Sequence, residues 1–407
     1  MNKLVANRPH LGIFGRRNTG KSSLINALTG QQVAIVSDTP GTTTDVVKKS
    51  IEIFGVGPVV VMDTAGIDDE GDLGRQRVET ARHAMRKVDL ALLVVAGEEF
   101  GTWETDLVEG FRSLGLPYIV VINKTDLTLP SEQFIQSITT KAGRNPVIVS
   151  ATQKTGLEEL ISAIKEGFPA SVFRKRSILE GLVSEGDWVV LVTPIDNEAP
   201  EGRMILPQVM AIRDVLDHGG INVVLREDQV EGYFSRQNVR PAIVVTDSQV
   251  FGKIHSFIPE EVPFTSFSIL MTRKKGFFED MYRFTPEISN LRDGDKVLIL
   301  ESCSHQVNCD DIGRFKLPGM IRQFTGVEPE FDFVQGLSPL PEDLKAYQLA
   351  IQCGGCMVTD RQLGNRVRQL LQEGIPVTNY GMALAWMTGI FNRVTQPVAA
   401  LISETTV

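Results

Sequence analysis

A phosphate-binding motif near the N-terminus constrains the fold of this 407-residue chain more than any other feature. Gly15-Arg-Arg-Asn-Thr-Gly20-Lys21-Ser22 follows an apolar run typical of a strand and opens a stretch typical of a helix. Its glycines let backbone N–H groups wrap phosphates at the helix N-terminus. Lys21 is expected to reach the β- and γ-phosphates, and Ser22 to give its hydroxyl to Mg²⁺. The pattern predicts a P-loop on a parallel sheet.

Three further motifs follow the P-loop in the order of a guanine-nucleotide site. Asp63-Thr-Ala-Gly66, Asn123-Lys124-Thr-Asp126 and Ser150-Ala151 each end a predicted strand, where open parallel sheets bind ligands. The Asp126 carboxylate can accept the N1–H and the exocyclic amine of guanine, which adenine does not offer. The motifs therefore predict GTP as the nucleotide. The candidate binding residues are Gly15, Asn18, Thr19, Gly20, Lys21, Ser22, Ser23, Thr43, Asp63, Gly66, Asn123, Lys124, Asp126, Ser150 and Ala151.

The first switch is expected at Pro40-Gly41-Thr42-Thr43-Thr44-Asp45. This segment resembles the G-x-T-x-D of the translation-factor-like GTPases that include tRNA-modifying TrmE, and the spacing selects Thr43 as the second Mg²⁺ ligand. Lys21, Thr43 and Gly66 are thus the candidate catalytic residues. Ile67 stands where Ras-type switches have a water-orienting glutamine, so slow intrinsic hydrolysis is expected. Asn18 matches the asparagine that helps TrmE-like proteins hold K⁺, which implies potassium-stimulated hydrolysis.

Short β-branched runs alternate with amphipathic stretches along the whole chain, which indicates an α/β protein with mainly parallel sheets. We expect a P-loop GTPase domain over 1–170 and two smaller α/β domains over 177–262 and 263–407. Predicted strands are 11–14, 59–62, 90–95, 118–122, 147–149, 188–192, 221–225, 242–245, 264–270, 296–300, 330–334, 347–351 and 377–378. Helices are predicted at 157–166, 208–216, 277–284, 361–372 and 382–387, among others.

Composition limits which kinds of partner and which cellular compartment are expected for this chain. The formal charge of −9 argues against general nucleic-acid binding, which needs an excess of Lys and Arg on one face. The longest apolar runs are far shorter than the roughly 20 residues that span a bilayer, and the N-terminus lacks the apolar core of a signal peptide. A cytoplasmic protein with no membrane contact is expected. In that compartment cysteines serve as metal ligands or redox thiols more often than as disulfides.

All four cysteines fall within 54 residues, as Cys303-Ser-His305, Cys309 and Cys353-Gly-Gly-Cys356. Cys303 and Cys353 each follow a predicted strand, so the sheet brings them together, and three thiolates suit a soft metal or an iron-sulfur cluster. Structural zinc, a redox pair and inert thiols are the alternatives. His305 is a candidate fourth ligand; Glu301 and Asp310 are weaker candidates.

Taken together, the motifs resemble the maturation GTPases of iron-iron hydrogenases over essentially the full chain. Supporting stretches are Thr193-Pro-Ile-Asp196, Gly202-Arg-Met-Ile-Leu-Pro207 and Asp310-Asp-Ile-Gly313-Arg314. The resemblance implies a homodimer formed by the middle domain. It also implies a 4Fe-4S cluster held by Cys303, Cys353 and Cys356, with an exchangeable ligand on the remaining iron. A diiron precursor, assembled with two radical-SAM maturases, would pass from there to the apo-hydrogenase, with GTP as a timing signal.

Two positions depart from that family pattern. Gln352 stands where His commonly precedes Cys-x-x-Cys, and Cys309 lies outside the pattern. The fourth ligand therefore stays open between His305, a carboxylate, water and Cys309. The alternative function is a TrmE-like GTPase with a structural zinc site, acting in RNA modification or ribosome-linked regulation.

Overall fold

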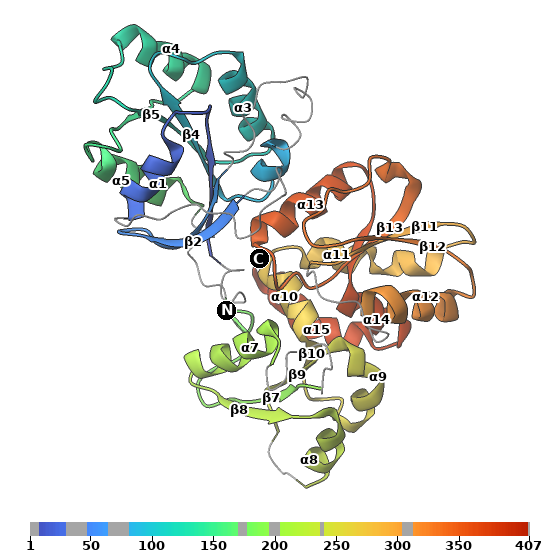
Figure 1. The fold of residues 1–407 in the computed structure, drawn as a ribbon. Helices are drawn as coiled ribbons and strands as arrows, with labels where there is room; N and C mark the ends of the chain where they lie inside the picture. The colour runs from blue at the N-terminus through green and yellow to red at the C-terminus, as the bar shows by residue number, and fades with distance from the viewer. Residues whose placement is uncertain are drawn as a thin grey trace. The chain divides into compact units, whose positions relative to one another are not determined.

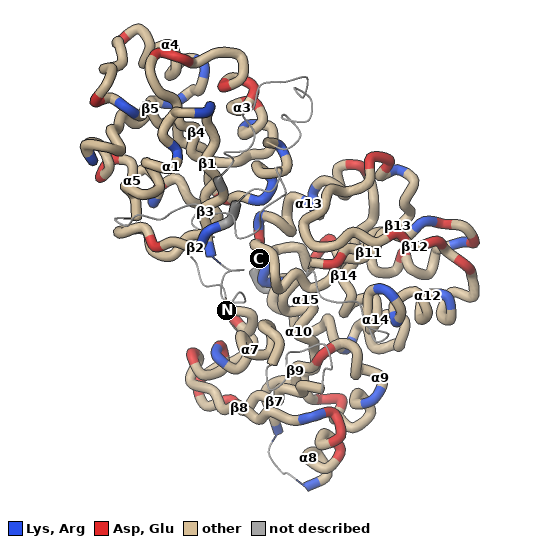
Figure 2. Tube along the Cα trace, viewed as in Figure 1, with Lys and Arg blue, Asp and Glu red and all other residues tan. Residues whose placement is uncertain are grey.

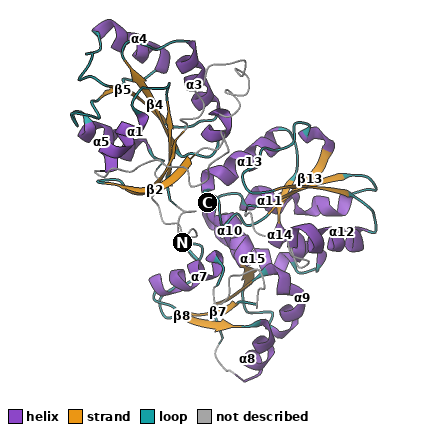
Figure 3. Ribbon diagram, in the orientation of Figure 1, coloured by secondary structure: helices purple, strands orange, loops and turns teal. Residues whose placement is uncertain are grey.

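The computed structural model describes residues 8–29, 47–63, 81–169, 177–194, 204–236, 240–302 and 312–405. The chain divides into two compact units, Met1–Lys175 and Arg176–Val407. Each unit is built from helices and strands in alternation (Figures 1 and 3). In the described part of the chain, no helix combines the length and apolar character that crossing a bilayer requires.

The first unit is a six-stranded sheet with the order β2-β3-β1-β4-β5-β6. Only β2 runs antiparallel to its neighbour, and the other pairings are parallel. The strands that follow β1 in sequence, β2 and β3, lie on one side of it, and β4 lies on the other side. The P-loop, which follows β1, therefore lies at a topological switch point of the sheet. Its elements are β1 His10–Phe14, α1 Lys21–Thr29, β2 Val47–Ile53, β3 Gly57–Asp63, β4 Leu90–Ala96, α3 Thr102–Ser113, β5 Tyr118–Asn123, α4 Glu132–Ala142, β6 Val147–Ile148 and α5 Leu157–Gly167.

Both faces of this sheet are buried, which explains its nearly continuous apolar strands. Along β4, Leu90, Leu92 and Val94 pack into a core with α1 and α5, whereas Leu93 and Val95 pack into a second core with α3 and α4. The alternation follows from the two-residue period of a strand. The sheet thereby fixes its strand ends, where the nucleotide motifs begin.

The second unit contains two four-stranded parallel sheets, with the orders β10-β9-β7-β8 and β12-β11-β13-β14. One continuous hydrophobic core joins the two sheets. The strands are β7 Trp188–Val192, β8 Ile221–Leu225, β9 Ile243–Thr246, β10 Phe264–Ser266, β11 Lys296–Leu300, β12 Glu330–Val334, β13 Tyr347–Gln352 and β14 Val377–Asn379. The α-helices are α7 Leu206–Asp217, α8 Val230–Arg236, α9 Phe251–Ile254, α10 Phe267–Lys274, α11 Phe278–Phe284, α12 Leu317–Thr325, α13 Asp360–Gln372, α14 Tyr380–Met387 and α15 Phe391–Thr405.

The α/β class with mainly parallel sheets is confirmed, but the predicted strand over 264–270 is wrong in part. The strand β10 ends at Ser266, whose Oγ accepts a hydrogen bond of 3.3 Å from the Ile269 N–H and caps α10. The error arose because nearly every residue of the run is buried, so its period does not distinguish strand from helix. Moreover, β10 lies within the expected domain 263–407 but pairs with β9, in the sheet formed by strands of the expected domain 177–262.

Candidate functional site

The P-loop lies between the end of β1 and the start of α1. Gly20 has a φ of 86°, and a Cβ at this position would lie 2.4 Å from Nδ2 of Asn123. Only glycine meets both conditions. The Lys21 side chain is buried, and its Nζ donates hydrogen bonds to the carbonyl oxygens of Gly15 at 2.5 Å and Arg16 at 2.7 Å. Its ammonium group therefore sits against the loop that is built to surround phosphates.

The side chain of Asn123 joins the P-loop to the base-recognition segments. Its Nδ2 donates to the carbonyl oxygen of Thr19 at 2.9 Å, and its Oδ1 accepts from the Ala151 N–H at 3.1 Å. Asn123 is 1% exposed, so both halves of its amide are satisfied inside the protein. Asn123 thus holds three segments in one place and acts as a positioning residue.

The Asp126 carboxylate, which the sequence predicts to recognise guanine, is itself anchored. Ser150 is fully buried, and its Oγ donates to Oδ1 of Asp126 at 2.6 Å. The same Oγ accepts from the Gln153 N–H at 3.1 Å. Lys124, between the two motif residues, has a φ of 62°, in the left-handed region. Ser22 and Ser23 are exposed at the start of α1.

Several predicted residues lie outside the described part of the chain. In the nucleotide site these are Thr43 and Gly66; Asp63 ends β3, but its side chain is not described. In the cysteine site they are Cys303, His305, Cys309 and Asp310.

The cysteine pair follows directly on the carboxyl end of β13. Leu300 of β11 and Gln352 of β13 are in register, and the Cys353 N–H donates to the Leu300 carbonyl oxygen at 3.0 Å. Gly355 has a φ of 67°, and a Cβ there would lie 2.4 Å from Cδ1 of Leu363. The turn therefore needs glycine. The ends of two neighbouring parallel strands meet here, next to the sequence position of Cys303.

Two N–H groups point at Sγ of Cys353. The Ser302 backbone N–H lies 3.1 Å from the sulfur, and Nε2 of Gln352 lies 3.6 Å away. Nε2 of Gln352 also donates to the carbonyl oxygens of Leu300 at 3.2 Å and Cys353 at 3.1 Å, which fixes the orientation of the amide. Oε1 of Gln352 is buried with no hydrogen-bond partner among the described residues. Two hydrogen-bond donors therefore lie beside this sulfur.

Two buried cations flank the same cysteines. Burial lowers the pKa of Lys275, while the charges of Asp360 and Cys356 oppose that shift. Nζ of Lys275 donates to the Val358 carbonyl oxygen at 2.8 Å and to Oδ1 of Asp360 at 3.2 Å. Burial also lowers the pKa of Arg366, and the charge of Cys353 opposes it. A basic side chain therefore lies close enough to each sulfur to interact with it electrostatically.

An ion pair joins two residues that lie on either side of the Cys303 segment, residues 303–311. Nε and Nη2 of Arg314 donate to the two carboxylate oxygens of Glu301, at 3.0 and 3.2 Å. The Glu301 side chain is 6% exposed. Since both oxygens already bind one guanidinium, Glu301 is a poor candidate for the fourth cluster ligand.

The donor set fits the cluster that the sequence implies, as far as it is described. Cys353 and Cys356 both lie partly exposed at one strand end, with hydrogen-bond donors and cations around them. Within the described ranges, which omit 303–311, no three His, Cys, Asp or Glu side chains gather into a metal site. The third expected thiolate belongs to that omitted segment.

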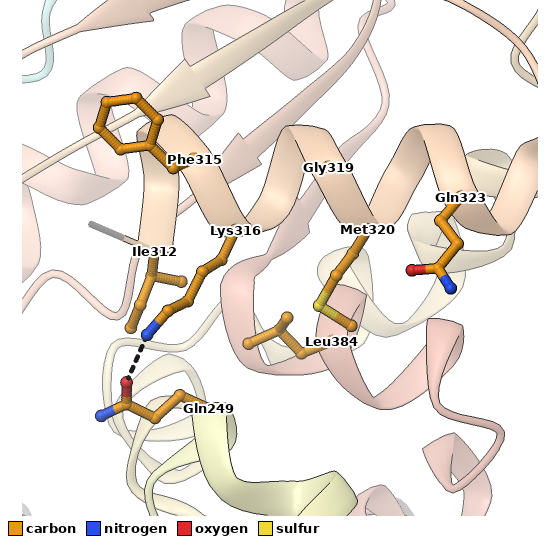
Figure 4. A pocket seen from close by; sticks show the side chains of 8 residues that line it. All are labelled: Gln249, Ile312, Phe315, Lys316, Gly319, Met320, Gln323 and Leu384. Atoms are coloured by element: carbon orange, nitrogen blue, oxygen red, sulfur yellow. Dashed lines mark hydrogen bonds between the residues drawn. The ribbon is translucent and has the colours of Figure 1, made fainter. Parts of the chain in front are cut away.

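A pocket of about 380 Å³ lies beside α12, immediately after the Cys303 segment (Figure 4). Two of its lining residues contact each other, with Nζ of Lys316 donating to Oε1 of Gln249 at 3.4 Å (Figure 4). The lining side chains are Gln249, Ile312, Phe315, Lys316, Gly319, Met320, Gln323 and Leu384. Phe315 is 54% exposed, so this region presents apolar surface to solvent.

Sequence reasoning missed the pair Arg16 and Glu104 in the nucleotide site, and Lys275 and Arg366 in the cysteine site. Arg16 lies inside the P-loop motif, but its partner is 88 positions away. Lys275 ends the basic run Arg273-Lys274-Lys275, a pattern typical of solvated surface, yet its side chain is 1% exposed. Lys275 follows Arg273 and Lys274 and precedes Gly276, so no local pattern singles it out.

Three family models match successive parts of the chain. The model of a 50S ribosome-binding GTPase matches residues 10–124. The dimerization domain of hydrogen maturase F matches 178–276, and its tetramerization domain matches 279–397. These last two matches together span more than half of the chain.

Individual relatives are similar to a smaller share of the chain. The tRNA modification GTPase MnmE of Heliobacterium modesticaldum is 41% identical over 158 residues, 38% of this chain and 33% of that protein. MnmE of Bacillus mycoides is 41% identical over 159 residues, 38% of this chain and 34% of that protein. The chain therefore spans about a third of the length of these curated relatives. A crystal structure of Aquifex aeolicus Era bound to GDP and AlF4⁻ is 23% identical, covers 53% of this chain and 92% of its own, and has a TM-score of 0.34.

Proposed function

The chain belongs to the hydrogen maturase F family, and on that premise we propose that it is a GTP-hydrolysing scaffold and carrier for the diiron subcluster of an iron-iron hydrogenase. Its last domain would hold a 4Fe-4S cluster through Cys303, Cys353 and Cys356. The precursor would be assembled there and delivered to the apo-hydrogenase.

One observation carries the proposal: Cys353 follows β13 at a strand end in register with β11, and Sγ accepts a hydrogen bond from Ser302. The next residue after Ser302 is Cys303. Neighbouring strand ends would thus supply sulfur ligands from positions 50 residues apart in sequence. A cluster bound by three cysteines supplies one iron position with an exchangeable ligand, which suits a carrier.

The residues of this chain have separate tasks around that cluster. Cys353 and Cys356 would bind it, Ser302 and Gln352 would donate hydrogen bonds to a ligating sulfur, and Lys275 would offset negative charge. Because Arg314 binds the Glu301 carboxylate, the fourth position would fall to His305, another carboxylate, water or Cys309.

In the nucleotide half, the GTPase chemistry follows from the P-loop and base-recognition motifs. Lys21 would move from its contacts with P-loop carbonyls to the β- and γ-phosphates, and Ser22 and Thr43 would bind Mg²⁺. With Ile67 in place of a glutamine, we propose slow hydrolysis stimulated by K⁺ bound near Asn18. GTP would change partner affinity through differential contacts in its two switch states.

Matches to domains named for dimerization and tetramerization support oligomerization, and we propose a homodimer formed through β8. This strand is at the edge of its sheet, and its sequence, Ile-Asn-Val-Val-Leu, is mostly apolar. Ile221 and Val224 are each 43% exposed. An exposed apolar edge strand pairs readily with a second chain, and a second copy would cover it.

The proposed partners are the apo-hydrogenase and the radical-SAM maturases, in the cytoplasm. In both units acidic positions are interspersed with the basic ones (Figure 2), and the net charge is −9. This distribution supports protein partners over nucleic acid. The RNA-linked alternative draws on similarity to MnmE, which covers 38% of this chain.

Anaerobic purification with iron and sulfide analysis tests the proposal. Wild type should be brown and contain about four irons per chain when fully loaded, and transfer of precursor should activate an apo-hydrogenase. Cys353→Ala should lose most of the iron, whereas Cys309→Ala should retain it, because Cys303, Cys353 and Cys356 would still hold the cluster. A colourless wild type that binds zinc and cannot be reconstituted would favour the alternative function.

A further inference from the structure

An ion pair joins the P-loop to helix α3. Nε and Nη2 of Arg16 donate to Oε1 and Oε2 of Glu104, at 2.6 and 3.0 Å. The Glu104 side chain is 1% exposed, and its Oε2 also accepts from the Gly101 N–H at 2.8 Å. The guanidinium lies 6.0 Å from the ring centre of Trp103. One carboxylate therefore joins the start of α3 to the phosphate-binding loop.

The backbone of Arg16 organises the loop that its side chain anchors. Its carbonyl oxygen accepts from Nζ of Lys21 at 2.7 Å and from Oγ1 of Thr19 at 2.9 Å. Thr19 in turn supplies the carbonyl oxygen that Asn123 binds. Displacing the Arg16 backbone would thus disturb both Lys21, which is expected to bind the phosphates, and the P-loop backbone at Thr19.

We propose that Arg16 and Glu104 are positioning residues, which hold the P-loop in its phosphate-binding shape and make the start of α3 a determinant of nucleotide affinity. The inference rests on nucleotide binding at this site and deepens the proposed GTPase function. Neither side chain is required to touch the nucleotide.

The physical reason is preorganisation. A loop that is already in its bound shape loses less conformational entropy when the ligand arrives. The bidentate guanidinium–carboxylate geometry restrains both position and rotation of the loop, which a single point charge does not. Once phosphates are bound, their own contacts hold the loop. Loss of the pair should therefore weaken binding while leaving turnover at saturation nearly unchanged.

The test measures GDP dissociation constants and release rates, together with kcat at saturating GTP, for Arg16→Gln, Glu104→Gln and the double variant. Each single variant should bind GDP about tenfold more weakly, mainly through faster release, with kcat within about twofold. The double variant should lose no more than either single one, because the two residues act as one unit. Arg16→Lys keeps the positive charge but loses the two-point guanidinium geometry. Its GDP affinity should fall between those of wild type and Arg16→Gln.

Arg112→Gln is the matched control, since Arg112 is in the last turn of the same helix and donates to Tyr118 Oη and the Lys141 carbonyl oxygen. It should leave GDP affinity unchanged. If the Arg16 and Glu104 variants lower only the melting temperature while the folded protein binds GDP as wild type does, the inference is overturned. Additive losses in the double variant would also overturn it. A wild type that binds no guanine nucleotide would instead refute the proposed GTPase function.

Discussion

The backbone N–H of Ser302 donates a hydrogen bond to Sγ of Cys353 across 3.1 Å, although the two residues are 51 positions apart. The contact exists because β11 and β13 are parallel neighbours whose carboxyl ends are in register. Consequently the segment that begins at Cys303 starts beside the first thiol of the Cys-Gly-Gly-Cys turn. The cysteine site is in this respect a product of sheet topology.

Removing the amide of Gln352 should lower the reduction potential of the bound cluster. Its Nε2 lies 3.6 Å from Sγ of Cys353, and a donor to a ligating sulfur favours the more negatively charged, reduced state. For Gln352→Met we expect a shift of about 40 mV to lower potential, equivalent to about 1 kcal/mol in a one-electron couple. Redox titration followed by electron paramagnetic resonance measures it.

Gln208→Met is the control for that substitution. Gln208 is also buried, but it caps helix α7, which lies next to the sheet that contains β7 and β8 and not the one that contains β13. It should leave the potential unchanged. Equal potentials in wild type and Gln352→Met would contradict the assigned hydrogen bond.

Breaking the Arg314–Glu301 pair should reduce both stability and iron content. Arg314→Gln leaves a nearly buried carboxylate without its guanidinium, which should cost roughly 2–3 kcal/mol in the free energy of unfolding. Iron content should fall as well, because the pair joins residues on either side of the Cys303 segment. Urea denaturation and iron analysis measure the two effects.

Arg322→Gln is the control, since Arg322 pairs with the exposed Glu328 and belongs to α12. It should cost less than about 1 kcal/mol and retain iron. Normal iron loading in a destabilised Arg314→Gln would limit the pair to a structural role.

Sequence patterns predicted most of this architecture because strands in parallel sheets are short, apolar and bounded by motifs. Thus Lys296–Leu300 and Glu330–Val334 match the predicted strands 296–300 and 330–334. The prediction failed where burial removed the periodicity, as over 267–270, which begins α10, and it did not include the edge strand Val47–Ile53. Neither can be inferred from a local pattern alone.

The candidate sites, like the fold, contain residues that the sequence predicts and residues that it does not. Motif residues such as Lys21 and Cys353 could be selected from the sequence because local spacing encodes their chemistry. Their positioning partners could not, because the ion pair of Arg16 with Glu104 and the contact of Cys353 with Ser302 join residues distant in sequence. Only the assembled sheets bring these groups together.

A charged substitution on β8 should separate the proposed homodimer. Val224 is 43% exposed on an edge strand, and Val224→Lys places an ammonium group where a second copy would pack. Light scattering after size-exclusion chromatography should show a smaller assembly than wild type. Phe54→Lys is the matched control, since Phe54 is 89% exposed on the GTPase unit and outside this edge. An unchanged mass for Val224→Lys would exclude β8 as the interface.

GTP turnover should depend on the monovalent cation. Asn18 lies in the P-loop with a φ of 64° and an exposed side chain, and Ile67 provides no group to polarise water. We expect kcat in KCl to exceed that in NaCl by at least about tenfold, which corresponds to about 1.4 kcal/mol of barrier. Asn18→Ala should abolish the difference while retaining GDP binding. Equal turnover in both salts would contradict a potassium site.

Acid should remove the contribution of Glu104 to the stability of the GTPase unit. Burial raises the pKa of Glu104, but hydrogen bonds from Arg16 and the Gly101 N–H outweigh it and leave the pKa below its ordinary value of 4.5. A carboxylate with a depressed folded-state pKa stabilises the protein above its unfolded-state pKa, and loses that effect as the pH falls through the folded-state value. The stability difference between wild type and Glu104→Gln should therefore be constant from about pH 7 to about pH 5 and shrink below about pH 4. Urea denaturation at those pH values measures it, and a difference that persists undiminished at the lowest pH would show that the ion pair is not its source.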